Sequence, residues 1–520
     1  MLMLRLRRLA LVGVILPVLA HSQAPGPLAQ ASGVRLNRVD CASLPGFQLA
    51  GARITEAAAF PAGESGPVKV AHCRVAGVID REIRFVEYLP DQWNERLFAG
   101  GGGGFVGKPE NQAIASANLG YATVGTDTGH DGEGTDARWA LHNRERQINY
   151  GYFGVHRTAE IAKAVVTAYY GADPKFTYFF GCSNGGRQAL MEAQRFPDDF
   201  DGIVSCAPAL DFTNIAASFI RNTQVVFPDP KALQAAAISP DNLRLLESKV
   251  LEACDARDGV TDGVLDDPRE CRFDVKSLPA CEADKAGASC VTATQRGAIE
   301  RVYTPTMSQG KVIYPGQPFG GEGQFGAWQP WITGMNAPAD RPGAPPSVQY
   351  AFGTQFFKYL AVGREDWDYA SYDLARWQAD TAAAASYLDA VDSDLSRFKA
   401  HGGKLILSHG WSDPALNPLS TIAYYDRLQA RDANVRDYAR LFMMPGVLHC
   451  GGGAGPDSVD WFGPIAEWVE HGHAPERLLA QKRAEGRIVN ARPLCPYPQR
   501  AVYDGKGNVS EAASYVCRSR

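Results

Sequence analysis

The order of apolar and polar residues between positions 83 and 210 alternates between two periods. Short apolar runs, which are typical of buried strands, are separated by segments in which apolar residues recur every three or four positions. In residues 155–170, Ile161, Val165 and Tyr169 fall on one face of a helix. The predicted strands are residues 83–89, 96–99, 122–124, 177–180 and 203–206, and a further helix is predicted over residues 185–195. This order predicts an α/β protein with a mostly parallel sheet and helices on both of its faces.

The alternation stops near residue 211 and returns after residue 394. The intervening segment has acidic loops, closely spaced cysteines, stretches rich in Pro and Gly, and many aromatic residues. Apolar strand-like runs then appear again, the first of them at residues 405–407. We therefore predict one α/β domain, made of residues 25–210 and 395–520, which is interrupted by a lid domain at residues 211–394.

The first 24 residues have the pattern of a secretory signal peptide. Three arginines precede a short apolar stretch, and small residues that suit cleavage follow it. The apolar stretch is short for a membrane span, so a membrane anchor is the less favoured alternative. With 45% hydrophobic and 21% charged residues, the chain is predicted to be a secreted or periplasmic globular protein without a membrane partner after cleavage. A formal net charge of −5 argues against a nucleic-acid partner.

Eleven cysteines fit an exported protein, because disulfides persist in oxidising compartments. They allow five bridges and one free thiol, which we assign to Cys206 because it lies in the apolar run GIVSCAPA. Short spacings suggest three local pairs: Cys254 with Cys271, Cys281 with Cys290, and Cys495 with Cys517. The other cysteines predicted to be bonded are Cys41, Cys73, Cys182 and Cys450.

The stretch from Gly181 to Gly185, GCSNG, matches the G-x-S-x-G pattern of a nucleophile elbow. It lies between a predicted strand and a predicted helix, where a sharp turn would raise the hydroxyl of Ser183 above the sheet. The pattern alone is weak, and a glycine-rich turn is the alternative. If the stretch is an elbow, Ser183 is a nucleophile. The backbone N–H of Asn184 then lies at the start of a helix, where it can stabilise an oxyanion.

A serine nucleophile needs an acid and a histidine base, which follow it in that order in this type of fold. Asp413 follows the strand predicted at residues 405–407, and His449 follows another predicted at residues 438–443. Both would lie at carboxyl ends of strands, where an open α/β sheet keeps its active site. The alternatives are a solvated turn aspartate and a packed loop histidine. His409 competes with His449 for the role of base, but it lies at a strand end.

Five successive glycines, Gly100 to Gly104, follow the strand predicted at residues 96–99. Backbone without side chains can approach a substrate closely and direct N–H groups toward it, so this loop is the candidate source of a second oxyanion donor. We favour the N–H of Gly103, with Gly102 next. A flexible turn and a phosphate-binding loop are alternatives, but the Lys-Ser/Thr end of a P-loop is missing.

An acidic loop, DARDGVTDGVLDDPRE, lies between two cysteines of the predicted lid. Oxygen ligands on a glycine-punctuated loop suit Ca²⁺, although the spacing does not fit an EF-hand. The candidate ligands are the carboxylates of Asp255, Asp258 and Asp262 and the backbone carbonyls of Val260 and Val264. The alternative is a solvated acidic loop held by a disulfide. Because the loop is far from the candidate triad in sequence, an ion bound there is expected to be structural.

Several of these stretches resemble the tannase and feruloyl esterase family of α/β-hydrolases: GCSNGGRQALMEAQRFPDDFDGIVSCAPA, HGWSDP, HCGGGAGPDSVDWF, GGGGFVG and RPLCPYP. The likeness covers nearly the whole chain after the signal peptide. It implies an α/β-hydrolase fold in which Ser183, Asp413 and His449 form the triad. It also implies a disulfide between Cys182 and Cys450, which adjoin Ser183 and His449, a structural calcium ion on the acidic loop, and a lid that binds an aromatic acyl group.

The predicted function is that of a secreted serine esterase that hydrolyses esters of aromatic carboxylic acids by two-step acyl transfer. Feruloyl esters are the first expectation. Galloyl esters and mono(2-hydroxyethyl) terephthalate are alternatives, because the lid would decide between them. A catalytically silent binding protein and a peptidase are more remote, since all three triad residues are present. The lid aromatics that could form a small core or contact the acyl group are Phe319, Phe325, Trp328, Trp331, Phe352, Phe356 and Phe357.

Overall fold

The computed structural model describes residues 39–63, 65–334 and 344–519. The predicted signal peptide lies outside the described residues. Within them, no helix has both the length and the apolar character that a membrane crossing requires.

A nine-stranded sheet forms the centre of the molecule, in the order β1-β2-β3-β5-β4-β6-β7-β10-β11. β1, β2, β3 and β5 pair antiparallel, whereas β5, β4, β6, β7, β10 and β11 pair parallel. The prediction of an α/β protein with a mostly parallel sheet is therefore confirmed. The strands are β1 (Ala52–Phe60), β2 (His72–Ile79), β3 (Ile83–Pro90), β4 (Arg96–Gly100), β5 (Ala122–Thr126), β6 (Phe176–Cys182), β7 (Gly202–Cys206), β10 (Lys404–Gly410) and β11 (Ala439–Met444).

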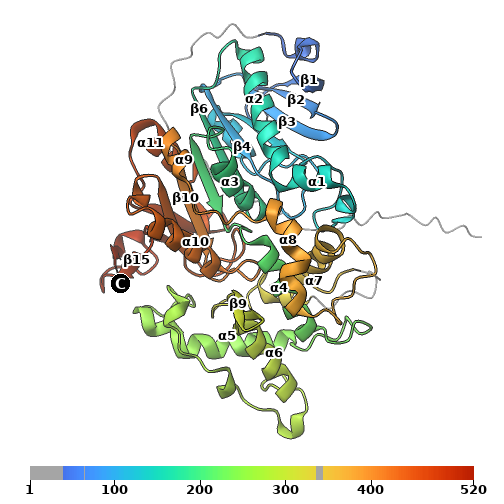
Figure 1. The fold of residues 1–520 in the computed structure, drawn as a ribbon. Helices are drawn as coiled ribbons and strands as arrows, with labels where there is room; N and C mark the ends of the chain where they lie inside the picture. Colours follow the sequence, from blue (N-terminus) through green and yellow to red (C-terminus); the bar gives the residue numbers. More distant parts are fainter. Residues whose placement is uncertain (1–38, 64, 335–343, 520) are drawn as a thin grey trace, which may run out of the picture.

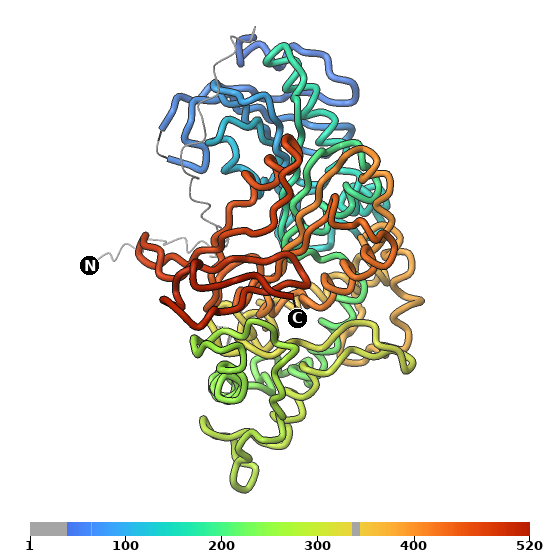
Figure 2. The backbone as a smooth tube through the Cα atoms, turned by 90° about the vertical axis from the view of Figure 1, so that its left-hand side faces the viewer, coloured from blue at the N-terminus to red at the C-terminus, as the bar shows by residue number. Residues whose placement is uncertain are grey.

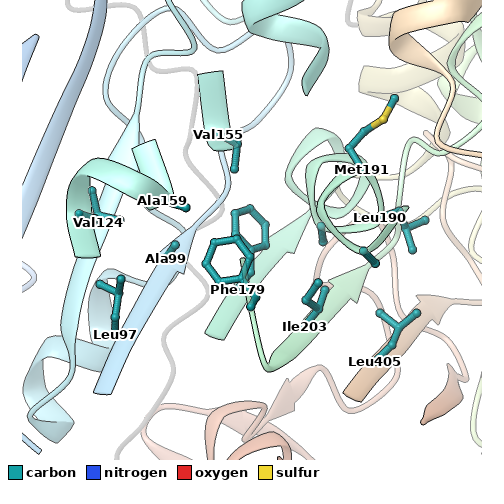
Figure 3. Packing of buried hydrophobic residues seen from close by; sticks show 14 of the residues in the cluster. Leu97, Ala99, Val124, Val155, Ala159, Phe179, Leu190, Met191, Ile203 and Leu405 are labelled. Carbon is teal, nitrogen blue, oxygen red and sulfur yellow. The ribbon is translucent and has the colours of Figure 1, made fainter. Parts of the chain in front are cut away.

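Helices cover both faces of this sheet because its central strands are apolar on both sides. One face, with Leu97, Phe179, Ile203 and Leu405, packs against the helices α2 (Gly154–Tyr170), α3 (Asn184–Arg195) and α10 (Pro418–Arg431) (Figure 3). The alternate residues of the same strands, such as Phe98 and Ile406, pack against α11 (Phe462–His471). The period of two along each strand thus distributes its side chains between two hydrophobic layers.

The described part of the inserted segment, residues 211–334 and 344–394, adds no strand to the nine-stranded sheet. It forms its own hydrophobic core, in which Leu246, Val250 and Ile299 are fully buried. Figures 1 and 2 show its green and yellow part, including α5 and α6, at the end of the molecule opposite β1 to β3. Its main elements are α4 (Phe212–Val226), α5 (Pro240–Cys254), α6 (Ala293–Tyr303), β8 (Thr306–Ser308), β9 (Lys311–Tyr314), α7 (Val348–Gln355) and α8 (Trp377–Leu388). The division into domains stays a prediction.

Sequence patterns located β3 and the parallel strands within about one to three residues. They missed β2, although none of its residues is exposed, and they also missed the exposed strands. β1 alternates only weakly and is largely exposed, so it shows no apolar run. The C-terminal strands β13 (Leu478–Ala484) and β14 (Arg487–Leu494) are also mixed in character. The remaining elements are α1 (Arg144–Ile148), α9 (Ser396–His401), β12 (Ser458–Val459), β15 (Arg500–Tyr503) and β16 (Tyr515–Arg518).

Five disulfides join ten of the eleven cysteines: Cys41 with Cys73, Cys182 with Cys450, Cys254 with Cys271, Cys281 with Cys290, and Cys495 with Cys517. The pairs predicted from spacing and from the family resemblance are therefore present. Cys206 is free and buried, as predicted. Burial raises the pKa of its thiol to about 12, so it does not ionise at neutral pH.

Candidate active site

The turn between β6 and α3 holds Ser183 in a strained backbone conformation. Ser183 has φ 64° and ψ −123°, a combination that residues other than glycine rarely adopt. A Cβ atom on Gly181 would lie 2.2 Å from the carbonyl oxygen of Gly185, so this tight turn requires glycine. The G-x-S-x-G stretch is therefore a nucleophile elbow in the expected strand–turn–helix context.

His449 connects Ser183 to Asp413 at the carboxyl ends of β6, β10 and β11. Its Nε2 lies 2.9 Å from Ser183 Oγ, and its Nδ1 lies 2.8 Å from Asp413 Oδ2. An ionised carboxylate only accepts hydrogen bonds, so the proton of a neutral His449 sits on Nδ1 and Nε2 can accept the serine proton. The fold thus brings the three predicted residues together, although 266 positions separate the serine from the histidine.

Asp413 is fully buried, and donors surround its carboxylate. Oδ1 accepts the backbone N–H groups of Ala415 and Leu416 at 2.8 and 2.9 Å, while Oδ2 faces His449 and also His409. Burial raises the pKa of Asp413, but the charge of His449 and the hydrogen bond from His409 outweigh it and hold the pKa well below its usual value. Asp413 is therefore an anion at neutral pH.

The second histidine of this region, His409, does not reach the serine. It lies within β10, paired with Met443 of β11, and only 1% of its surface is exposed. Its Nε2 is directed at Asp413 Oδ2, 3.2 Å away. The structure therefore places His449, rather than its competitor, beside Ser183.

The disulfide between Cys182 and Cys450 joins the two loops that carry Ser183 and His449. The Cα atoms of its cysteines are 6.0 Å apart, and 268 positions separate them in the chain. The side-chain oxygen of Gln112 accepts the backbone N–H of Cys182 at 2.7 Å, which adds a second fixed point beside the serine. Sequence reasoning missed Gln112, since no motif marks a side chain that acts only on neighbouring backbone.

The glycine loop lies beside the elbow, but the predicted donor has another partner. The N–H of Gly103 donates to Glu110 Oε2 at 2.7 Å, and the N–H of Gly102 donates to Gln188 Oε1 at 3.0 Å. Both groups are therefore occupied by buried or half-buried side chains. This geometry argues against the predicted roles of Gly103 and Gly102, because an N–H already held by a protein oxygen is not open to a substrate oxyanion.

Gly104, the next residue, differs from both. Among the hydrogen bonds of the described residues, none uses its N–H as a donor. Its backbone has φ +49°, and the hydroxyl of Tyr150 donates to its carbonyl at 2.8 Å. The side chain of Asn184 donates to the carbonyl of Gly102 at 3.0 Å, so the elbow itself fixes the loop. The backbone N–H of Asn184 is at the first position of α3, where a helix has no internal acceptor for it.

Two of the seven lid aromatics reach this region. The ring of Trp331 meets that of His449 edge to face, with centroids 5.0 Å apart. A Cβ on Gly104 would lie 3.0 Å from the ring of Phe352. Trp331 and Phe352 also pack on an apolar cluster that includes Ile215, Phe219 and Leu416. An apolar and aromatic surface therefore lies next to the triad.

The other five lid aromatics have different surroundings. Phe319 packs against Tyr303, with ring centroids 4.5 Å apart, and Trp328 is buried in the lid core. Phe356 and Phe357 are buried in a second cluster that joins the lid to the first part of the chain. Phe325 is 90% exposed. Most of the seven lid aromatics therefore form hydrophobic cores, which is one of the two roles that the sequence analysis considered for them.

The predicted calcium loop folds into short turns between its two disulfide-bonded cysteines. The carboxylates of Asp255 and Asp258 accept backbone N–H groups of the same loop. Asp262 also accepts the backbone N–H of Val264, and both Asp262 and Asp266 bond to the buried guanidinium of Arg492, which comes from β14. Arg492 is another residue that sequence reasoning missed, because it lies more than 200 positions away in the chain.

The chemistry of this loop fits a hard cation. Burial raises the pKa of Asp258 to about 6 and that of Asp266 to about 7, which shows that their negative charge is costly there. Carboxylate and carbonyl oxygens are also the ligands that Ca²⁺ prefers. However, no three acidic side chains of the loop, all of it described, bring one oxygen each within 4.8 Å of one another. Binding would therefore require the loop to contract around the ion.

The family model for tannase and feruloyl esterase matches residues 68–518. The chain belongs to this family. An uncharacterised esterase of Xanthomonas campestris is 34% identical over 98% of this chain and 94% of its own length. The mono(2-hydroxyethyl) terephthalate hydrolase of Piscinibacter sakaiensis is 32% identical over 90% of this chain and 88% of its own length. The predicted membership of a family of ester hydrolases is therefore confirmed.

Solved structures support the same fold. The crystal structure of feruloyl esterase B from Aspergillus oryzae matches with a TM-score of 0.81 and 25% identity, over 92% of this chain and 99% of that one. The tannin acyl hydrolase of Aspergillus niger, at 21% identity, matches with a TM-score of 0.71 over 92% and 93% of the two chains. The predicted α/β-hydrolase class is thus confirmed.

Proposed function

We propose that this family member is an exported serine esterase that hydrolyses esters of aromatic carboxylic acids. The observation that carries the proposal is the hydrogen-bonded chain from Ser183 through His449 to Asp413, with the aromatic ring of Trp331 against the histidine. A nucleophile, a base and an oriented acid are what acyl transfer requires. Five disulfides support export into an oxidising compartment.

In the first step, Ser183 Oγ attacks the ester carbonyl while His449 Nε2 takes the hydroxyl proton. The buried Asp413 carboxylate stabilises the imidazolium that forms and keeps Nδ1 directed toward itself. His449 then returns the proton to the leaving alcohol, and an acyl-enzyme remains. In the second step a water attacks the acyl group while His449 takes its proton, and His449 returns that proton to Ser183 Oγ as the acid leaves.

The negative oxygen of each tetrahedral intermediate needs donors that are free before the substrate arrives. We assign this role to the backbone N–H groups of Asn184 and Gly104. Asn184 is at the N-terminus of α3, where the helix dipole also favours negative charge. Gly104 replaces Gly103 in this assignment because the Gly103 N–H is held by Glu110.

The acyl group would lie against Trp331 and Phe352. An aromatic acid buries a large flat surface on such rings, which favours it over a short aliphatic acid. Relatives named feruloyl esterase B from Aspergillus niger are 28–29% identical over 92% of this chain. Feruloyl esters stay the first proposed substrates. Galloyl esters and mono(2-hydroxyethyl) terephthalate are the alternatives, and a mono(2-hydroxyethyl) terephthalate hydrolase is 32% identical to this chain.

An ester panel tests this function. Methyl ferulate, methyl gallate and mono(2-hydroxyethyl) terephthalate would be compared with ethyl butyrate as an aliphatic control. The wild type should turn over at least one aromatic ester faster than the control, and Ser183→Ala should abolish that turnover while keeping the Tm within a few degrees. No turnover of any aromatic ester by the wild type would refute the proposal and favour a silent binding protein.

The acidic loop of the lid is proposed to bind a structural Ca²⁺. The ligands would be the carboxylates of Asp255, Asp258 and Asp262 and the carbonyls of Val260 and Val264. The cost of their burial supports this assignment, since a divalent cation offsets it. The ion would stabilise the lid and take no part in the acyl-transfer steps.

A further inference from the structure

Asp413 Oδ2 is shared by two histidines, of which the acyl-transfer steps use only one. His449 Nδ1 lies 2.8 Å from this oxygen and His409 Nε2 lies 3.2 Å from it. Both the carboxylate and the His409 ring are almost fully buried, at 0% and 1% side-chain exposure. Bulk water therefore does not reach this oxygen in the folded protein.

The neighbours of His409 determine which of its nitrogens carries the proton. Nε2 faces two acceptors, Asp413 Oδ2 and the backbone carbonyl of Leu416 at 3.0 Å, so Nε2 must be protonated. Nδ1 lies 2.8 Å from Thr421 Oγ1, whose hydroxyl can donate to it. Neutral His409 is therefore a donor toward Asp413, with its ring orientation fixed by Thr421 of α10.

The backbone also fixes where this donor stands. His409 belongs to β10, which is bonded on both sides, to β7 and to β11, whereas Asp413 lies in the loop that follows. A residue in a central strand provides a rigid reference for a loop residue. The other charged or titratable groups near Asp413 are His449 and the buried hydroxyl of Tyr314, which accepts the N–H of Asn417.

We propose that His409 is a positioning residue of the triad. It donates from Nε2 to the carboxylate oxygen that His449 uses, and so holds Asp413 in the rotamer that aligns His449 with Ser183. The proposal rests on the proposed esterase function. It extends the chain of side chains to Thr421, His409, Asp413, His449 and Ser183, of which only the last two touch the reacting atoms.

The test compares His409→Gln with His409→Asn. Glutamine can place an amide N–H near the position of Nε2, whereas asparagine can place one only near Nδ1, on the side of Thr421. His409→Asn should lower kcat by about 10- to 100-fold, the effect of one lost hydrogen bond to a charged group, with KM little changed. His409→Gln should recover most of that loss, and both variants should keep a near-wild-type circular dichroism spectrum.

The pH dependence of kcat/KM distinguishes a positioning role of His409 from a role in packing alone. Without the His409 donor, His449 becomes the only side chain bonded to Asp413 Oδ2, so its imidazolium is stabilised more strongly. The acid limb of the kcat/KM profile of His409→Asn should therefore move to higher pH, and that of His409→Gln should stay near the wild type. Equal losses in both variants, or an unchanged kcat and profile in His409→Asn, would overturn the proposal. If His409→Asn does not fold, His409→Leu takes its place.

A second readout does not depend on the identity of the ester. A fluorophosphonate labels an activated serine when Oγ displaces fluoride, and its rate reports how well His449 activates Ser183. His409→Asn should be labelled about 10- to 100-fold more slowly than the wild type. If the wild type is labelled but hydrolyses no aromatic ester, the proposed substrate class is wrong, whereas the role of His409 is not contradicted. Equal labelling rates for the wild type and His409→Asn would contradict the role of His409.

Discussion

Two aspartates of this protein, one fully buried and one half-buried, show how the environment sets the charge of a single residue. Asp413 is fully buried but has four donors, so its pKa is lowered and it serves as an anion. Asp211, at the start of α4, accepts one hydrogen bond from Asn214 and lies near Asp389. Burial and the charge of Asp389 raise its pKa to about 7. Donors, rather than burial alone, therefore decide which carboxylate is ionised.

The raised pKa of Asp211 predicts a stabilising substitution. The pKa of this carboxyl in an unfolded chain is near 4. Between about pH 4 and pH 7 it ionises in the unfolded chain but stays protonated in the folded protein, so the free energy of unfolding falls as the pH rises through this range. Asp211→Asn removes this penalty and should stabilise the fold by about 1–2 kcal/mol at pH 8, since the side chain is partly exposed. The Tm difference from the wild type should be largest above pH 7 and vanish near pH 4. Asp394→Asn, at an exposed carboxyl whose pKa is lowered, is the control and should give no gain.

At the level of elements, the active site depends on the ends of three parallel strands and on the bridge between their loops. β6, β10 and β11 end at one edge of the sheet, which brings Ser183, Asp413 and His449 together. The loop with His449 has Cys450 at φ 60°, and the disulfide to Cys182 restrains it. This arrangement predicts that the bridge supports both stability and activity.

Removing that bridge should therefore have two effects. In the chain-entropy model, a bridge that closes a loop of 268 residues stabilises the fold by about 5 kcal/mol. The double variant Cys182→Ser and Cys450→Ser should lower the Tm and also slow fluorophosphonate labelling of Ser183. The matched control is Cys281→Ser with Cys290→Ser, whose loop spans 9 positions in the lid. The control variant should lower the Tm less and leave the labelling rate of Ser183 unchanged. If both double variants changed the labelling rate equally, the bridge between Cys182 and Cys450 would not position the triad.

On the scale of the whole molecule, residues from distant segments complete the lid and fix it to the sheet domain. Arg492 of β14 bonds to Asp262 and Asp266 of the acidic loop. A second contact is an apolar cluster in which Phe105 and Tyr150 meet Ile220 and Phe356 of the inserted segment. The inserted segment thus has a hydrophobic cluster of its own and shares a second one with the first part of the chain. We expect the thermal stability of the lid to depend on the acidic loop.

Removal of calcium tests this dependence. Treatment with EDTA should lower the Tm, and Ca²⁺ should restore it while Mg²⁺ does not, because Mg²⁺ resists such a large all-protein ligand set. Asp258→Asn should make the Tm insensitive to EDTA. Asp274→Asn, at an exposed carboxylate outside the loop, should keep the wild-type response. A wild-type Tm that EDTA does not change, with no calcium found by elemental analysis, would exclude a structural ion.

The sequence by itself determined the α/β order, the family and the three residues that we propose as the triad, because each leaves a local mark. Buried strands are apolar runs, an elbow needs glycines around its serine, and an acid and a histidine follow strands in a set order. Short spacings also gave three of the five disulfides. The edge strand β1 was missed because its exposed residues carry no apolar run, and β2 was missed although it is buried.

Only the tertiary structure decided which groups face one another. It showed that Glu110 accepts the N–H of Gly103, which is why we propose Gly104 as the second oxyanion donor. It moved His409 from a competing base to a partner of Asp413, and brought Arg492 to the acidic loop. Such pairings depend on distances between groups that are far apart in the chain or on the direction of a single N–H, and neither leaves a trace in the local order of residues.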